Sequence, residues 1–283
     1  MNPKMHTVRL GVIRGWIEFQ IYYLKDLSSL IGIVIIALIL VGVLWFERAT
    51  NIGGISLALL TLPGLLSMLI ANEGFSDVAR FLSSHREDGT LLRAKAIPQG
   101  MPAYVIARVV VTLLATIFNL ALVFVLSLFV VPGLANLDGT RLLVFFGVLV
   151  FGLTATAPMG AIIGSLVKSS GAGFGLTFFP LVALLAISGI FYPIRALPVW
   201  VQWIAQVFPV YWLGLGLRSV FSPATAAALE LGGTFRPLAT FLVLAGWSVV
   251  GLLLAPLVLR RMARRTSGSE MEAGKQRSMR QRG

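Results

Sequence analysis

Long apolar stretches separated by short polar segments dominate the chain. Six stretches have about 19 residues or more, enough for a helix to cross about 30 Å of hydrocarbon. The predicted spans are 27–46, 55–75, 104–131, 142–167, 174–192 and 237–259. The third and fourth spans are long enough to tilt or to protrude from the bilayer. The pattern therefore predicts an all-α integral membrane protein with a six-helix transmembrane domain over residues 27–260.

The loop between the second and third spans, residues 76–103, contains the polar segment 84–98, SHREDGTLLRAKAIP. Gly89 can take the left-handed conformation that ends a helix, Thr90 can cap the next helix, and Pro98 stops it. The segment therefore predicts a helix, a sharp corner and a short helix. Its charges of both signs suit docking on a protein surface, although a solvated loop would look the same. The charged residues are Arg86, Glu87, Asp88, Arg93 and Lys95.

The N-terminal segment 1–26 is amphipathic. It has no uninterrupted apolar core of the signal-peptide type, so we expect it to be retained. At 100° per residue, Arg14, Glu18 and Lys25 fall on one face. The opposite face carries Val12, Ile13, Trp16, Ile17, Tyr23, Leu24 and Leu27. This pattern is typical of a helix lying in the membrane interface, and a frayed tail without a role is the alternative.

The loop after the fifth span, residues 193–236, is rich in aromatic residues and prolines. It begins PIRALPVWVQWIAQVFPVYWLGLGLRSVF, and no piece between prolines is long enough to span. We therefore predict two short helices that dip into the outer leaflet or cap the bundle, with aromatic rings at headgroup depth. The residues that we assign to this outer re-entrant gate are Pro193, Pro198, Trp200, Trp203, Pro209 and Tyr211.

Composition and charge agree with a membrane protein and indicate its orientation. The 283 residues are 57% hydrophobic and 12% charged, and the net charge is +12. Of the 23 Lys and Arg residues, all but five lie in segments that share one side of the predicted topology. The five are Arg48, Arg141, Arg195, Arg218 and Arg236. Both termini should therefore be cytoplasmic. We expect the basic tail 261–283 to be disordered and to act as a stop signal that touches anionic lipid, with nucleic-acid binding remote.

Little in the chain suggests catalysis or cofactor binding. There is no cysteine, there are two histidines, and no HExxH, GxSxG or GxxxxGK[ST] motif occurs. We therefore expect no enzyme activity, metal or cofactor in this chain itself. Glu73 and Arg108 are the only charged residues within the predicted spans. Both lie near predicted cytoplasmic ends, so we favour snorkelling over a functional pair across the second and third spans.

Three further features of the spans bear on packing. Asn119 lies deep in the third span, where an interhelical hydrogen bond is favoured over a substrate contact. Gly160 and Gly164 form a GxxxG pair that allows another helix to approach closely. Pro158 and Pro180 interrupt backbone hydrogen bonding within the fourth and fifth spans. These residues indicate a packed bundle with no internal energy source.

Two stretches, in this order, resemble the ABC-2 type transporter permeases, and most closely those of the daunorubicin-resistance type. The run REDGTLLRAKAIPQGMPAYVIARVV resembles their cytoplasmic loop and the span after it. The run SGIFYPIRALPVWVQWIAQVFPVYWLGLGLR resembles their outer loop after the fifth span. With the amphipathic N-terminal helix and the six-span layout, the resemblance covers nearly the whole chain.

The resemblance implies a type V exporter fold in which this chain pairs with a separate ATPase subunit that binds ATP and Mg²⁺, in two copies. A second permease copy, either identical or a paralogue, would complete the complex in a prokaryotic cytoplasmic membrane. The outer re-entrant helices would be 198–208 and 210–221, and the second and fifth spans would line the pathway. In that family the loop between the second and third spans docks on the ATPase. This implies docking by Arg86, Glu87, Asp88, Gly89, Thr90, Leu91 and Leu92, with the segment from Ala94 to Pro98 closing the motif.

The implied function is outward movement of an amphiphilic drug, lipid or natural product. Two other classes remain open: a self-sufficient channel or secondary carrier, and a membrane-embedded enzyme. The carrier predicts transport without ATP or a partner. The enzyme predicts a polar catalytic cluster that the sequence does not display.

Overall fold

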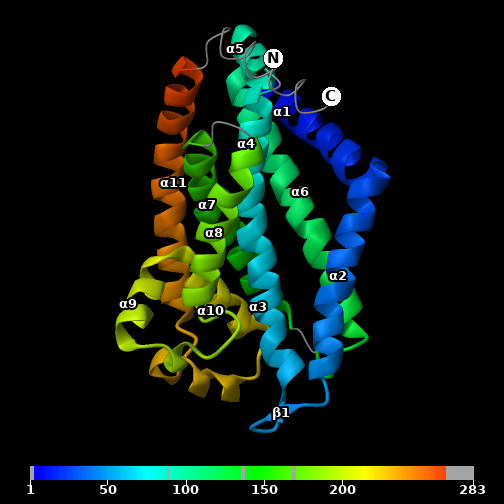
Figure 1. The fold of residues 1–283 in the computed structure, drawn as a ribbon, viewed down its shortest axis with the longest axis vertical. Coiled ribbons are helices and arrows are strands. Elements are labelled where there is room, and N and C mark those ends of the chain that lie inside the picture. The colour runs from blue at the N-terminus through cyan, green and yellow to red at the C-terminus, as the bar shows by residue number, and fades with distance from the viewer. Residues whose placement is uncertain (1–2, 88, 135–137, 167–169, 266–283) are drawn as a thin grey trace.

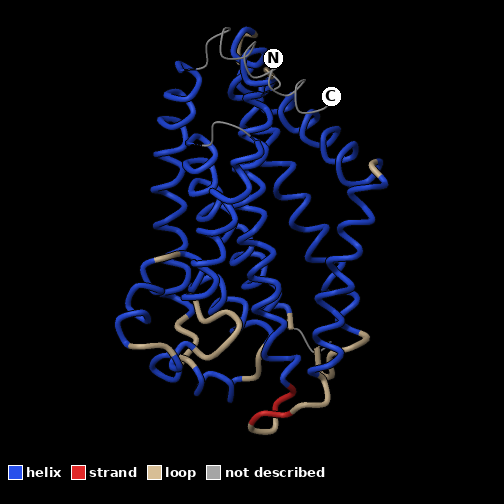
Figure 2. Tube along the Cα trace, viewed as in Figure 1, coloured by secondary structure: helices blue, strands red, loops and turns tan. Residues whose placement is uncertain are grey.

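The computed structural model describes residues 3–87, 89–134, 138–166 and 170–265. Asp88, residues 1–2, 135–137 and 167–169, and tail residues 266–283 lie outside these residues. Long helices run along the longest axis of the molecule (Figure 1). The described chain is helical apart from loops and one short hairpin (Figure 2).

The N-terminal half holds the first three long helices and the polar corner. Its helices are α1 (Pro3–Phe19), η1 (Gln20–Lys25), α2 (Leu27–Glu47), α3 (Leu57–Asn72), η2 (Glu73–Asp77), α4 (Val78–Glu87), α5 (Thr90–Ala96) and α6 (Gly100–Leu128). The remaining helices are α7 (Gly139–Leu166), α8 (Ser170–Ile187), η3 (Ile194–Ala196), α9 (Val199–Val207), α10 (Pro209–Phe221), η4 (Ala224–Leu229), η5 (Leu231–Gly233) and α11 (Pro237–Arg265). Figure 1 places α5 and the N-terminus at one end of the bundle, with α9 and β1 toward the other.

The predicted all-α membrane fold is confirmed. In the described part of the chain, five helices are long and apolar enough to cross a membrane. They are α2, the helix from Leu57 to His85, α6, α7 and the first part of α11. The predicted fifth span corresponds to α8, whose 18 residues extend about 27 Å at 1.5 Å per residue. The last helix continues to Arg265, through residues that the sequence assigned to the tail.

The amphipathic helix α1 packs against α6 through glycines. A Cβ at Gly15 would lie 2.8 Å from the carbonyl oxygen of Ala107, so only glycine allows this approach. Phe19 and Tyr23 are buried beside α6. Tyr23 was predicted on the apolar face that meets the membrane, so its burial corrects that assignment, whereas the other residues of this face, including Val12 and Trp16, are exposed. This face is free to meet lipid, and its place in the membrane interface stays a prediction.

A two-stranded hairpin that was not predicted joins α2 to α3. Its strands, β1 (Asn51–Ile52) and β2 (Ile55–Ser56), are antiparallel, and Ile52 is opposite Ile55. Gly53 and Gly54 form the turn with φ of 60° and 82°. Two positive φ values in a two-residue turn match the twist of a tight hairpin, and glycine takes them without strain.

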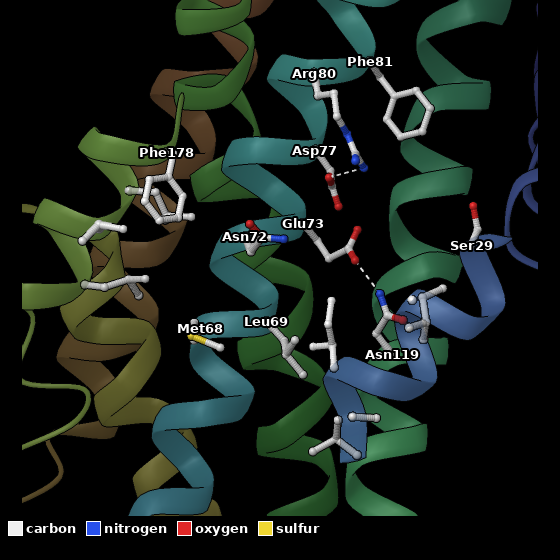
Figure 3. Close-up of a pocket in the computed structure, with 18 of the residues that line it drawn as sticks. Ser29, Met68, Leu69, Asn72, Glu73, Asp77, Arg80, Phe81, Asn119 and Phe178 are labelled. Carbon is white, nitrogen blue, oxygen red and sulfur yellow. Dashed lines mark hydrogen bonds and ion pairs between the residues drawn. The ribbon is translucent and has the colours of Figure 1, made fainter. Parts of the chain in front are cut away.

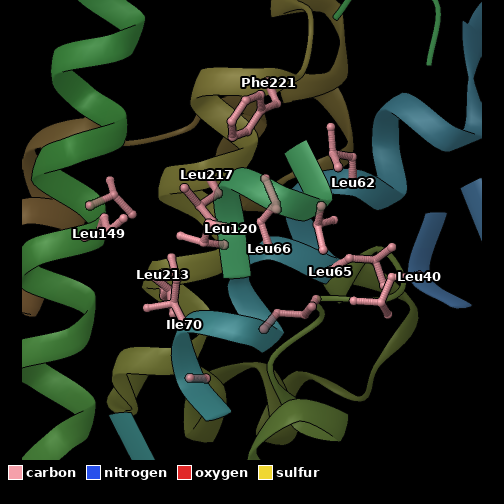
Figure 4. Close-up of a cluster of buried hydrophobic side chains, with 14 of the residues drawn as sticks. Leu40, Leu62, Leu65, Leu66, Ile70, Leu120, Leu149, Leu213, Leu217 and Phe221 are labelled. Carbon is pink, nitrogen blue, oxygen red and sulfur yellow. The ribbon is translucent and has the colours of Figure 1, made fainter. Parts of the chain in front are cut away.

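The apolar core lies between α2, α3, α6, α7, α8 and α10 (Figure 4). Leu62, Leu66 and Ile70 of α3 have an exposed fraction of 1% or less. Leu213 and Leu217 of α10 are fully buried against them. Helix α10 is therefore inserted into the bundle and packs on the long helices α3 and α7.

Candidate functional site

A sharp corner between α4 and α5 marks one end of the bundle (Figure 1). Gly89 has φ of 74° and takes the N-cap position of α5. Thr90 is therefore the first helical residue, and the prediction that Thr90 caps this helix is wrong. Ile97 is extended, with φ of −99° and ψ of 135°, as expected for a residue before proline. The structure has the predicted order of helix, corner and short helix.

The corner has a packed inner side and an exposed outer side. Leu91 and Ala94 are each 4% exposed and pack in one cluster with Leu82, Tyr104 and Ala161. The outer side carries Arg93, Ile97 and Pro98, which are exposed. Asp88 and the side chains of Arg86, Glu87 and Leu92 lie outside the described part of the chain. Docking of an ATPase on the predicted coupling residues therefore stays a prediction. The packing of the short helix α5 against the bundle supports it.

Two hydrogen bonds tie the corner to its neighbours. The ring Nδ1 of His85 lies 3.0 Å from the hydroxyl oxygen of Tyr104 on α6. The Thr7 hydroxyl of α1 donates to Oε1 of Gln99, which has φ of 58° just before α6. The corner is thus held to both α1 and α6.

One continuous helix connects the corner with the membrane-embedded core. The helix runs from Leu57 to His85 through α3, η2 and α4, so no break separates the predicted span 55–75 from the predicted loop 76–103. Its middle segment, Glu73–Asp77, is a π-helical turn, a wide turn that often marks functional positions. A displacement of the corner would therefore act directly on the span.

Helix α7 packs against this helix at backbone distance. A Cβ at Gly160 would collide with the carbonyl oxygen of Phe75, and one at Gly164 would lie 2.8 Å from Cα of Ala79. The predicted close approach of a helix at the GxxxG pair is confirmed. The two glycines fix η2 and α4 against α7.

A groove of about 1040 Å³ opens beside η2 (Figure 3). It is bounded by η1, α2, α3, η2, α4 and α8, with Asn119 and Val123 contributed by α6. Its walls are mostly aliphatic and aromatic. The helices α3 and α8 correspond to the second and fifth spans that the family resemblance associates with a pathway, and α2 is a third wall.

Glu73 projects into the groove and is only 4% exposed. Nδ2 of Asn119 donates to its Oε1 at 2.5 Å, which confirms the predicted interhelical hydrogen bond. The prediction that Glu73 snorkels to the surface is wrong. The helix continues beyond Glu73 to His85, so Glu73 lies about 18 Å from that end at 1.5 Å per residue.

Arg108 does not pair with Glu73. Its guanidinium lies 3.9 Å from the centre of the Phe81 ring, which is cation–π geometry. The polar partner of Glu73 on the third span is thus Asn119 and not Arg108.

Sequence reasoning missed two charged residues of the groove, Asp77 and Arg80. Nη2 of Arg80 lies 2.5 Å from Oδ1 of Asp77. With Glu73, they are spaced i, i+4 and i+7, so they share one helical face. This spacing is visible in the sequence and could have indicated a polar stripe extending the second span.

The outer loop forms the two short helices that were predicted. Helices α9 and α10 meet at 90° around Phe208. Pro198 directly precedes α9, and Pro209 is the first residue of α10, where its missing N–H leaves no hydrogen bond unmade. Pro193 directly precedes the short helix η3. The prolines therefore set the starts of the helices.

The aromatic residues assigned to the outer gate do not share one surface. Trp200 and Trp203 are 66% and 70% exposed, whereas Tyr211 is fully buried. Nη2 of Arg236 donates to the Tyr211 hydroxyl at 2.5 Å. Tyr211 is therefore an anchor of α10, the two tryptophans face outward, and a gating role stays a prediction.

A buried ion pair at this end was also missed. Nε of Arg218 on α10 lies 2.5 Å from Oε1 of Glu230, and the two side chains are 12% and 7% exposed. Nη1 of Arg218 donates to the carbonyl oxygen of Gly189, just beyond α8. The pair links α10 to α8 and to the loop before α11. Arg218 had been considered only as one of the positive charges outside.

No group of three or more His, Asp or Glu residues is arranged to hold a metal ion in the part of the chain that the structure describes. Comparison with curated proteins found no match. The family model described as ABC-2 type transporter matches residues 9–222, which run from α1 through the corner and the groove to the end of α10. The chain therefore belongs to the ABC-2 type transporter family and is a multi-pass membrane permease component of an ABC transporter, not catalytic by itself.

Proposed function

We propose that the chain is the permease of an exporter that moves an amphiphilic drug, lipid or natural product outward across a prokaryotic cytoplasmic membrane. A separate ATPase subunit, present in two copies and binding ATP and Mg²⁺, drives it. A second permease copy completes the complex. Resistance to several drugs would be one consequence of such efflux.

The observation that carries this proposal is the continuous helix from Leu57 to His85. One end of this helix leads into the exposed corner, and its middle turn lines the groove. A force applied at the corner would therefore reach Glu73 without crossing a flexible loop. This arrangement suits a passive permease that is driven from outside its own fold.

In the mechanism that we propose, closure of the ATPase pair moves the α4–α5 corner. The inner side of the corner is packed against α6 and α7 through Leu91 and Ala94, so the motion is passed on to these helices. The glycine contacts of Gly160 and Gly164 require α7 to move together with η2 and α4. The groove would then change its exposure between the two sides of the membrane.

The test is a search of the neighbouring genes for an ATPase with a P-loop, followed by reconstitution of this chain with that ATPase. Ile97→Asp places a charge on the exposed outer side of the corner, where the side chain is 61% exposed. Ile52→Asp is the matched control, because Ile52 is 50% exposed in the hairpin at the other end of α3. We expect Ile97→Asp to weaken ATPase capture and ATP-dependent export in proteoliposomes, and Ile52→Asp to leave both unchanged.

Two results would overturn the proposal. One is equal ATPase capture by both variants and the unchanged chain. The other is accumulation of a solute against its gradient by the chain alone, without nucleotide, which would establish the secondary-carrier alternative.

A further inference from the structure

The groove contains a buried carboxylate with an unfilled position. Oε1 of Glu73 accepts from Asn119, but Oε2 of Glu73 has no hydrogen-bond partner. The residue is 4% exposed and lines the groove. A buried carboxylate that lacks a cationic partner is unfavourable, because its charge is removed from water without compensation. A ligand that brings a positive charge to Oε2 would offset this cost.

The groove itself supplies no spare positive charge. Among the described residues that line it, the charged side chains are Glu73, Asp77 and Arg80. Arg80 is held by Asp77 at 2.5 Å. Figure 3 shows this pair one turn along the helix from Glu73, whose other contact is the amide of Asn119. The lining therefore offers no unpaired cation to an anionic ligand, and the acid that lacks a cationic partner is Glu73.

The two atoms without hydrogen-bond partners at this place are both acceptors. Oδ1 of Asn119 also has no hydrogen-bond partner. Glu73 Oε2 and Asn119 Oδ1 can both accept, so a ligand that satisfies them must donate hydrogen bonds. An ammonium group has such N–H donors and a positive charge, whereas a quaternary ammonium has the charge alone. The pair of acceptors therefore distinguishes a protonated amine from a cation that lacks N–H groups.

The rest of the groove suits an apolar body attached to that amine. The rings of Tyr22 and Phe178 and the thioether of Met68 line it, and aromatic faces also attract cations. Burial raises the pKa of Tyr23 well above its ordinary value, so its hydroxyl stays protonated. The volume of about 1040 Å³ is at the upper end of the range for sites that take drug-sized ligands, about 300–1,000 Å³.

We propose that this groove binds amphiphilic primary or secondary amines in their protonated form, with the ammonium donating to Glu73 Oε2 and Asn119 Oδ1. An inorganic divalent cation fits less well, because no group of three His, Asp or Glu residues is arranged for it within the described chain. The proposal rests on the proposed export function only in treating the bound amine as cargo. Binding itself requires neither the ATPase nor ATP.

The experiment uses the full chain in lipid nanodiscs and three fluorescent probes that share one aromatic body. The first is monodansylcadaverine, with a primary amine, the second its N-acetyl derivative, which is neutral, and the third its trimethylammonium analogue. We expect the unchanged chain to bind the primary amine at least about tenfold more tightly than either of the others. This comparison needs no variant and so does not depend on variant folding.

Two matched substitutions complete the test. Glu73→Gln is expected to reduce the affinity for monodansylcadaverine about tenfold and to leave that for the acetylated probe unchanged. Glu47→Gln changes a partly buried acid of α2 that does not line the groove and should leave both affinities unchanged. Equal affinities for the three probes, or an unchanged amine affinity in Glu73→Gln, would overturn the proposal. Because no nucleotide is present, such a failure leaves ATP-driven export to be decided by the reconstitution experiment.

Discussion

Asn119 of α6 donates a 2.5 Å hydrogen bond to Glu73 of η2 and so joins two membrane helices at the polar side of the groove. The two residues are 46 positions apart in the sequence. Their contact places an acid inside the bundle, beside the groove, and leaves one of its oxygens without a hydrogen-bond partner.

We predict that Asn119→Leu destabilises the chain because the Glu73 carboxylate then loses its donor. A hydrogen bond to a charged group contributes about 1.5–3 kcal/mol, and the loss should appear as a lower midpoint of thermal unfolding in detergent. In a Glu73→Leu background the same substitution should have a much smaller effect, since no carboxylate remains to be left unpaired. Equal effects in the two backgrounds would contradict this account.

Gly160→Val should disrupt the packing of α7 on η2, because its Cβ would collide with the carbonyl oxygen of Phe75. Overpacking typically costs about 1–3 kcal/mol, and the rigid backbone on the opposite side places the expected effect at the upper end. Gly246→Val on α11 is the control, since no atom lies within 4 Å of a Cβ built there. The check is the thermal stability of both purified variants, and a similar loss in both would argue against the contact.

Gly89→Val should weaken ATPase association and abolish transport while membrane insertion remains intact. Gly89 has φ of 74°, a conformation that costs a non-glycine residue about 1–2 kcal/mol and a β-branched one more. Gly89→Asn should retain more association, because asparagine tolerates this conformation better than other residues. In a pull-down with the ATPase, association should decrease from the unchanged chain through Gly89→Asn to Gly89→Val. A valine variant that associates normally would show that the corner geometry does not matter.

Breaking the outer ion pair should strongly reduce stability. Arg218→Met leaves Glu230 buried without its charge partner, and such a change typically costs about 3–5 kcal/mol. The double variant Arg218→Met with Glu230→Leu should recover much of this loss, because no isolated charge remains. Arg14→Met removes an i,i+4 pair with Glu18 on α1 whose Arg14 side chain is 37% exposed, and should cost only about 0.2–1 kcal/mol. The midpoints of thermal unfolding of the unchanged chain and of these three variants test the predicted losses.

Features set by local chemistry could be predicted from the sequence. The apolar runs show where helices cross the membrane, Gly89 marks the corner, and Pro198 and Pro209 start the two outer helices. Asn119 could be expected to form a hydrogen bond because an unpaired amide is unfavourable among apolar side chains.

Features that depend on how helices associate could not be predicted in the same way. Hydropathy falls at Asp77 and Arg80, so the second span appeared to end before them, yet the helix continues to His85. Glu73 was therefore placed near a surface, although packing turns it into the groove. The Arg218–Glu230 pair was missed because the chain between the two residues forms a return path that no local pattern indicates.

The π-helical turn at Glu73–Asp77 has a mechanical consequence. Such a turn accommodates one more residue than an α-helical turn, and the surplus can migrate along a helix without breaking it. When the surplus moves past a residue, that residue turns by about 100° about the helix axis, while the parts before and after the turn keep their relative orientation. A displacement of α4 that moved the turn past Glu73 would therefore rotate this side chain away from Asn119 and break their hydrogen bond.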